Sequence, residues 1–561
     1  MVGVAGKSKG CKTCRQRKIA CGLQRPQCAQ CIKSNRICLG YDRDVQFIPM
    51  QAKLTEKKLV VTSSFGEIRR SSAPIHKKGQ LPNSTSSTTS KSLESGHSNK
   101  NGYCPVEEQP KHAILNPILD GICASANRQQ LLNAFISICI PRDTEVAGSS
   151  SPRNGGPWLL LLRELSIRTV ALEASISAIS ASVLGRLQNN YSLIKESLKL
   201  YTIGLRELQK ALWNPRLMYN DEILAACLCL SLYEVLECPG EGNQAYYNHC
   251  KGCMRLVAAR GVERHVSGIG HELFLGLRSQ GILLSIVTRQ PSFLSTSLWM
   301  EDPWKEQPKR PLDRLMDCLC EAPAIYKTGD QVETLTPLES LEFHLDSISK
   351  LWKIDATLEG VYDDFAKEFP CPMYWSVLST EPSSADDPIL GKVFPVAYDF
   401  PYLKVARSLM MYWSCRFLVW AGFFYLYHGV MEIDIDAMDA HCSNYPDCAL
   451  FDDGMCHCRH LVVQQSGHYR YDKSHLKPLE FRLDLKSLVY NVCQSVEYCM
   501  KSSVPIFGVW SVTTPLSLVY ETVKHIPGFK REVAWMEAAL RKLQASGVRI
   551  IDYSTSINNP L

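Results

Sequence analysis

The chain contains 561 residues, of which 45% are hydrophobic and 21% are charged, and its net charge is +6. This composition is typical of a soluble globular protein, and the length is too great for one ordinary domain. The charge is unevenly spread. Residues 1–45 carry ten Lys or Arg and two Asp, a net charge of +8, so the remaining 516 residues sum to −2. A small basic head on a near-neutral body predicts a polyanionic partner for the head.

The N-terminus lacks the pattern of a secretory signal, because Lys7 and Lys9 are followed by Cys11 and further charge rather than by an apolar segment. The longest apolar stretch, residues 409–430, is interrupted by Arg416, and its uninterrupted part, 417–427, is too short to cross a bilayer. We therefore predict a buried core helix there, no membrane partner, and an intracellular protein with reduced thiols. In a reducing compartment, clustered cysteines favour a metal over disulfides.

Six cysteines in the head follow the spacing C-x2-C-x6-C-x6-C-x2-C-x6-C, in which the second half repeats the first and predicts two similar substructures about a pseudo-dyad. A C-x2-C pair suits two ligands of one tetrahedral zinc ion. Six thiolates form two four-thiolate sites if two of them are shared, which predicts a binuclear cluster. Because the head has few apolar side chains, metal binding must supply much of its folding free energy, on the order of 10 kcal/mol or more.

The stretch CKTCRQRKIAC resembles the fungal zinc-cluster transcription factors, whose core motif it matches through Arg15, Arg17 and Lys18. The resemblance implies two zinc ions and a division of the six thiolates into bridging and single-site ligands. The bridging ligands would be Cys11 and Cys28, with Cys14 and Cys21 completing one site and Cys31 and Cys38 the other. A metal buffer and an unrelated zinc knuckle are the alternatives.

In that family, the segment after the second cysteine belongs to a short helix that enters the major groove of DNA. The resemblance implies that Lys18 reads a CGG-type triplet, since guanine presents two acceptors to a cationic side chain. Arg15, Arg17, Lys12 and Lys33 would contact phosphates, which position the protein without specifying sequence. The alternative for each of these residues is a solvated basic surface.

Beyond Tyr41 the composition changes. Residues 46–115 are polar, include a Ser/Thr-rich tract at 83–99 and contain three basic pairs, so we predict a disordered linker. The basic pairs are either nuclear import signals or merely solvated charges. Pro49 interrupts the segment after the cluster and no heptad pattern is sustained there, so a homodimer and its half-site spacing are left open.

Apolar residues recur at helical spacing through much of the remaining chain, for example at residues 192–212 and 221–237. We predict that residues 116–561 form a large all-α body in which helices pack on helices. SLYEVLE at 231–237 and YYNHCKGCMRLVAARG at 246–261 are similar to elements of the fungal-specific transcription factor regulatory domain. We expect His249 and Gly261 to be structural, with Gly261 ending a helix.

A second concentration of possible metal ligands lies at residues 441–460. It contains four cysteines and three histidines: Cys442, Cys448, Cys456, Cys458, His441, His457 and His460. Its C-x-C spacing is unusual for a structural zinc site, which favours a loop with incidental thiols over a metal site.

No common catalytic motif is present. The sequence shows no G-x-S-x-G nucleophile elbow and no G-x4-G-K-[ST] phosphate loop, and Leu275 stands where a metalloprotease-like H-E-x-x-H would need its second histidine. We therefore predict that the chain is not an enzyme.

We predict instead a nuclear, DNA-binding transcription regulator of the RNA polymerase II type. It would have a zinc-cluster domain at 1–45, a linker at 46–115 and a regulatory body at 116–561, and its partners would be double-stranded DNA and the transcription machinery or co-regulators. Metabolic or biosynthetic genes are the targets that the resemblance implies. The alternative is a ligand-sensing or scaffold protein that uses the cluster for protein contacts.

Overall fold

The computed structural model describes residues 11–17, 19–24, 27–36, 38, 129–140, 158–163, 165, 167–237, 244–441, 443–444, 447–452, 455–502, 504 and 506–548. The chain divides into two compact units, Met1–Ala124 and Ser125–Leu561. The predicted linker, residues 46–115, lies outside the described residues.

Two short helices, α1 (Lys12–Gln16) and α2 (Ala29–Lys33), form the described part of the first unit. Each begins directly after a cysteine of the repeated motif. The core consists of four buried cysteines, Cys11, Cys14, Cys28 and Cys31, with Cys21 and Cys38 packed against it. The aliphatic side chains are exposed instead, as Ile32 shows at 62%. Sulfur atoms therefore occupy the place that apolar side chains fill in an ordinary domain.

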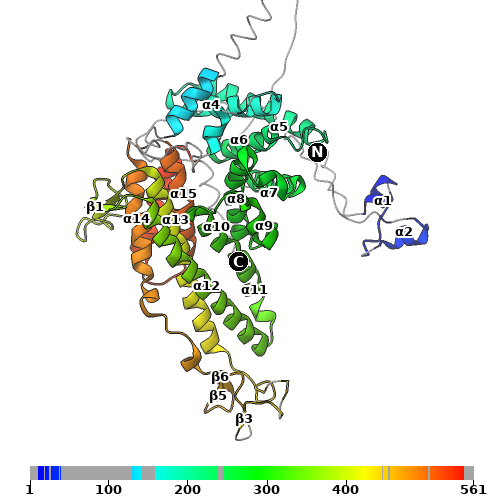
Figure 1. Ribbon diagram of the computed structural model, residues 1–561, viewed down its shortest axis with the longest axis vertical. Coiled ribbons are helices and arrows are strands. Elements are labelled where there is room, and N and C mark those ends of the chain that lie inside the picture. Colours follow the sequence, from blue (N-terminus) through cyan, green and yellow to red (C-terminus); the bar gives the residue numbers. More distant parts are fainter. Residues whose placement is uncertain are drawn as a thin grey trace, which may run out of the picture. The chain divides into compact units, whose positions relative to one another are not determined.

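The first half of the second unit is built around α6 (Asp221–Glu237), which is buried on most sides. Its neighbours are α4 (Val170–Leu187), α5 (Tyr191–Leu212), α7 (Gln244–Arg260) and α8 (Gly268–Thr288). Residues 129–139 are also helical, and η2 (Trp158–Arg163) packs on α8. Figure 1 shows α6 in the middle of this group.

Short elements connect the two halves of the body. They are η3 (Val262–His265), η4 (Phe293–Ser295), α9 (Ser297–Glu301), η5 (Asp302–Trp304), α10 (Pro311–Cys320), α11 (Ala322–Gly329) and η6 (Val332–Thr334). Gly261 ends α7 with a φ of 78°, as expected for a glycine at a helix end. The imidazole of His249 is buried and lies 3.1 Å from the carbonyl oxygen of Cys227.

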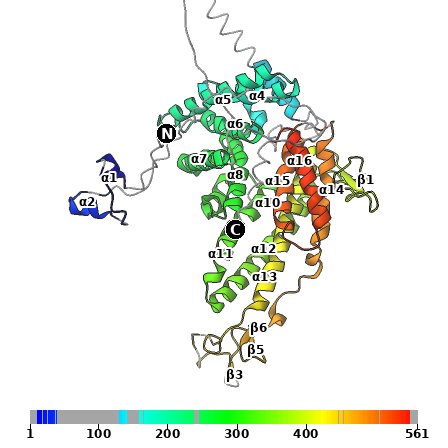
Figure 2. The same cartoon turned by 180° about the vertical axis from the view of Figure 1, so that it is seen from behind.

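The second half of the body contains two long helices, α12 (Pro337–Glu368) and α13 (Leu403–Glu432), which lie side by side in both views (Figures 1 and 2). Helices α14 (Leu485–Met500), α15 (Ile506–Val523) and α16 (Lys530–Ala545) complete it. Both α4 and α13 are apolar and long enough to span a bilayer, but most of each apolar window is buried inside the protein. The predicted buried helix at 409–430 is therefore confirmed as part of α13.

Strands are few in the described part of the body and form three two-stranded antiparallel sheets. They are β1 (Trp375–Leu378) with β2 (Val396–Asp399), β3 (Phe451–Asp452) with β4 (Met455–Cys456), and β5 (Leu461–Val463) with β6 (Tyr469–Tyr471). Two short turns of 3-10 helix, η7 (Lys473–His475) and η8 (Glu480–Leu483), lead into α14. The prediction of a helical body is confirmed, with these hairpins as additions.

Candidate metal centre and its basic surface

The six cysteines of the head come together in two groups of four. One group contains Cys11, Cys14, Cys21 and Cys28, and the other contains Cys11, Cys28, Cys31 and Cys38; within each group the sulfur atoms lie within 4.8 Å of one another. Cys11 and Cys28 belong to both groups. These are the two residues that the resemblance implies as bridging ligands, and their role as bridges stays a prediction.

Distances between the sulfur atoms fit tetrahedral zinc. With a Zn–S bond of about 2.3 Å, neighbouring ligands of a tetrahedron lie about 3.8 Å apart. The Sγ atoms of Cys11 and Cys28 are 3.6 Å apart, those of Cys14 and Cys28 are 3.5 Å apart, and those of Cys11 and Cys31 are 3.8 Å apart. These three distances are close to the tetrahedral value, so the sulfur atoms are already grouped as ligands of a metal ion would be.

The helices orient the two shared sulfur atoms. The backbone N–H of Cys14 donates to the Sγ of Cys11 at 3.4 Å, and that of Cys31 donates to the Sγ of Cys28 at 3.3 Å. Burial raises the pKa of the Cys31 thiol to about 12, so ionisation of the packed thiols needs a cation. A metal that replaces the protons supplies this charge, and the donor set of sulfur atoms alone suits zinc.

The basic residues around the cluster are described only in part. Lys18 lies outside the described residues, as do the side chains of Lys12 and Arg15, so their contacts with DNA stay predictions. Lys33 is exposed in the last turn of α2. The side chain of Arg17 is also exposed, but its Nη1 donates to the Oγ of Ser34 at 3.0 Å, a contact that sequence reasoning missed.

The contact between Arg17 and Ser34 has a signal in the sequence. The cysteine motif repeats with an offset of 17 residues, and the same offset relates Arg17 to Ser34. Equivalent positions of the two halves therefore touch each other, as residues close to a pseudo-dyad do. Ser34 also donates to the carbonyl oxygen of Gln30 at 2.7 Å, which ties this contact to the end of α2.

The loop at 441–460 is likewise described in part, because Cys442 and the side chain of Cys456 lie outside the described residues. Among the described side chains, groups that could hold a metal ion occur only in the head. His460 stacks on His475 with ring centroids 3.9 Å apart. The described part of this loop thus adds no support for a second metal site.

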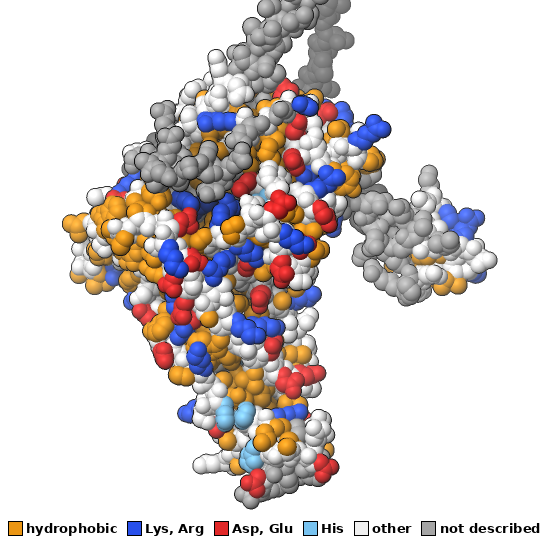
Figure 3. Space-filling model, in the orientation of Figure 1, with side chains coloured by type: hydrophobic (Ala, Val, Ile, Leu, Met, Phe, Trp, Pro, Cys, Tyr) orange, Lys and Arg blue, Asp and Glu red, His pale blue; other side chains and the backbone are white. Residues whose placement is uncertain are grey.

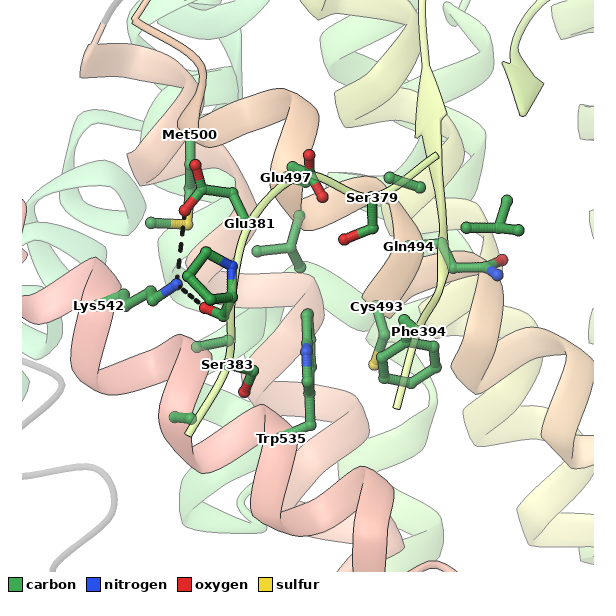
Figure 4. A pocket seen from close by; sticks show the side chains of 16 residues that line it. Ser379, Glu381, Ser383, Phe394, Cys493, Gln494, Glu497, Met500, Trp535 and Lys542 are labelled. Carbon is green, nitrogen blue, oxygen red and sulfur yellow. Dashed lines mark hydrogen bonds and ion pairs between the residues drawn. The ribbon is translucent and has the colours of Figure 1, made fainter. Parts of the chain in front are cut away.

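A narrow cleft lies in the body where the connection between β1 and β2 crosses α14 and α16 (Figure 4). Phe394, Trp535 and Met500 supply apolar surface, and Glu497 and Lys542 supply charge. The Oε1 of Glu497 accepts from the backbone N and the Oγ1 of Thr380 at 2.9 and 2.8 Å. Burial alone would raise the pKa of Glu497, but the hydrogen bonds that its carboxylate accepts outweigh this effect and lower the pKa, so it holds the connection in place as an anion.

Two regions of the chain match models of known protein families. Residues 9–46 match the model of the fungal Zn(2)-Cys(6) binuclear cluster domain, and residues 131–303 match that of the fungal specific transcription factor domain. Each of the two models thus matches the part of the chain in which the sequence showed the corresponding motifs. The resemblance noted in the sequence is therefore confirmed, and the metal that the head fits is zinc. Helices α10 to α16 lie beyond the second match, so the extension of the regulatory domain to residue 561 stays a prediction.

Two curated relatives are similar to parts of the chain. An uncharacterized protein of Emericella nidulans is 22% identical over 275 residues, which cover 47% of this chain and 58% of that protein. Arginine metabolism regulation protein II of Saccharomyces cerevisiae is 36% identical over 69 residues, or 11% of this chain and 8% of that protein. The chain thus spans little more than half the length of the first relative and a small part of the second. No solved structure matches the chain.

Proposed function

We propose that this chain is a nuclear, sequence-specific DNA-binding regulator of transcription. The observation that carries the proposal is the pair of four-sulfur groups that share Cys11 and Cys28. This arrangement accounts for all six cysteines of the motif with two zinc ions, and the two matched models are those of a fungal binuclear zinc cluster and a fungal transcription factor domain. The cluster would hold α1 rigidly enough to enter a major groove.

In this proposal, the ligands of the two ions are the residues of the two groups, with Cys11 and Cys28 as bridges. Lys18 follows α1 and would read a CGG-type triplet through the acceptors of guanine. Lys33, Lys12, Arg15 and Arg17 would contact phosphates and set the orientation on the duplex. The body would receive signals or bind co-regulators, and nothing in the proposed role requires catalysis.

Base reading by Lys18 is tested by Lys18→Ala in the full chain. We expect a loss of about 1–3 kcal/mol on a duplex with the cognate triplet, found first by selection from random oligonucleotides, and little loss on random DNA. Lys33→Ala is the matched control. It should weaken binding to both duplexes equally and reduce the slope of log K against log salt by about one unit.

The two variants separate the candidate functions. Equal losses on both duplexes for Lys18→Ala would contradict base reading. DNA binding that depends neither on the base sequence nor on salt would instead favour the alternative, a sensing or scaffold protein that uses the cluster for protein contacts.

A further inference from the structure

The hairpin of β1 and β2 has a free edge. The backbone N–H of Ser379 donates to the carbonyl oxygen of Pro395 at 3.0 Å. This bond identifies which residues of β1 direct their backbone groups toward β2. Since hydrogen-bonding direction alternates along an antiparallel strand, Val377 faces β2, whereas Ser376 and Leu378 direct their backbone groups outward. Within the described part of the chain, the N–H and C=O groups of Ser376 and Leu378 have no hydrogen-bond partner.

Exposed apolar side chains lie on β1 and on its connection to β2. Leu378 is 80% exposed and Trp375 is 42% exposed on β1, and the connection to β2 presents Ile389 and Leu390 at 93% and 67% exposure. Figure 3 shows apolar side chains gathered over the end of the body where Figure 1 labels β1. An exposed strand edge beside a concentrated apolar surface is a site at which another strand is readily added.

The exposed residues are held in place rather than loosely attached. Asp387 accepts from the backbone N–H groups of Ile389 and Leu390 at 2.7 and 2.8 Å. Arg531 on α16 donates to the carbonyl oxygen of Gly391 at 3.1 Å, and Lys542 donates to that of Pro382 at 2.5 Å. Figure 4 shows Lys542 reaching this connection. The hairpin therefore presents its apolar residues in a fixed arrangement, which reduces the entropy lost on binding.

We propose that a second copy of this chain pairs with the hairpin, β1 against β1, to form a four-stranded sheet across a two-fold axis. Two identical antiparallel strands are self-complementary by symmetry. With the axis at Val377, Ser376 of each copy lies opposite Leu378 of the other, and all the unpaired groups of both edges find partners. No residue of β1 is charged, so the axis brings no like charges together.

An interface built on so short a strand is small. Stable dimers bury about 1,200–2,000 Å², and one hairpin supplies less, so we expect weak association of the free chain. Two heads on neighbouring DNA half-sites would raise the effective concentration of the bodies into the millimolar range. This last step depends on the proposed function, but the strand pairing itself does not.

Disulfide formation tests the register on the free, full-length chain. In the proposed sheet the two copies of residue 377 form a non-hydrogen-bonded pair, in which Cα atoms lie about 4.5 Å apart and a disulfide is feasible. We expect Val377→Cys, in a background with the exposed Cys371 changed to Ser, to give a 377–377 linkage in a glutathione redox buffer. Peptide mass spectrometry identifies the linkage and excludes bonds to the other thiols.

Ser376→Cys in the same background is the control, because the register places its two copies too far apart to join. No 377–377 linkage at high protein concentration, or equal linkage at 376 and 377, would overturn the proposal. Leu378→Glu gives a second readout that needs no cysteine. It should lower self-association in sedimentation at least tenfold relative to the unmodified chain while leaving circular dichroism unchanged, and unaltered association would also overturn the proposal.

Experiments can contradict the strand pairing and the proposed function separately. A chain that forms the 377–377 linkage but does not bind triplet DNA would contradict the function and leave the interface standing.

Discussion

The two described regions of this chain are stabilised by different interactions. The core of the head consists of cysteine sulfur atoms, and its aliphatic residues are exposed, whereas the body buries an extensive set of aliphatic and aromatic side chains from most of its helices. A small segment with few apolar residues cannot offset its chain entropy by burial and depends on metal ligation. A body of more than 400 residues has no such need.

Chelation should show this difference most strongly. Removing zinc should unfold the head completely, because its few apolar side chains cannot replace the free energy of metal ligation, and should leave the body folded. All ten tryptophans lie between residues 158 and 535, so tryptophan fluorescence reports on the body alone. Hydrogen exchange of peptides from residues 11–38 reports on the head. A fluorescence change on chelation, or unchanged exchange in the head, would contradict the comparison.

A smaller effect should appear in the body at acid pH. His265 is fully buried, and its Nδ1 donates to the carbonyl oxygen of Gly270 at 3.1 Å. Burial lowers the pKa of His265 to about 4, so the unfolded chain binds a proton at this residue between about pH 6.5 and 4 that the folded chain does not. The stability of the body should therefore fall by up to about 3 kcal/mol as pH decreases through this window.

The pH effect of His265 is isolated by His265→Asn, which keeps a donor near Gly270 but does not titrate. Denaturant unfolding followed by tryptophan fluorescence at pH 7 and pH 5 should show a smaller pH-dependent loss in the variant. Identical losses in the two proteins would assign the pH dependence to other groups.

The smallest expected effect concerns the start of α12. The Oγ1 of Thr336 accepts from the backbone N–H of Glu339 at 3.3 Å, and the Oε2 of Glu339 accepts from that of Thr336 at 2.9 Å. Thr336→Ala should lower the free energy of unfolding of the body by about 1 kcal/mol. Thr357→Ala, in the middle of the same helix, is the control and should be neutral or slightly stabilising. Equal effects of the two changes would exclude capping as the cause.

Helix prediction succeeded where the apolar pattern was clear and failed where packing decided the structure. The predicted bounds at 221–237 are those of α6, and the segment at 192–212 corresponds to α5. Sequence patterns treat a carboxylate as an exposed residue, which is wrong for Asp355 in the middle of α12. In the structure Asp355 is buried and accepts hydrogen bonds from Trp420 and Arg482, two residues that lie far away in the sequence.

The apolar pattern of the sequence did not predict α4, α15 or the hairpins. Helix α4 mixes Ala, Ser and Ile around its whole circumference, and α15 contains Pro515, whose carbonyl oxygen accepts from Ser414 of α13. The short strands of β1 and β2 offer too few residues for alternation to be recognised. Their pairing depends on a long connection fixed by residues of α14 and α16.

The metal centre was the most predictable feature, because the cysteine spacing predicts a binuclear cluster and the family resemblance implies which thiolates would be shared. The contact between Arg17 and Ser34 was not predicted, although these two residues are related by the same 17-residue offset as the cysteines. Spacing identifies equivalent residues of the two halves, but only the folded arrangement brings them into contact.

The two shared sulfur atoms are fully buried, whereas Cys21 and Cys38, which serve one group each, are partly exposed. An oxidant or competing chelator therefore reaches Cys21 and Cys38 first, and damage to either one leaves the other four-sulfur group complete. A lesion at Cys11 or Cys28 would disable both at once, but these atoms are the last that a reagent reaches. We therefore expect bound metal to be lost first through Cys21 or Cys38.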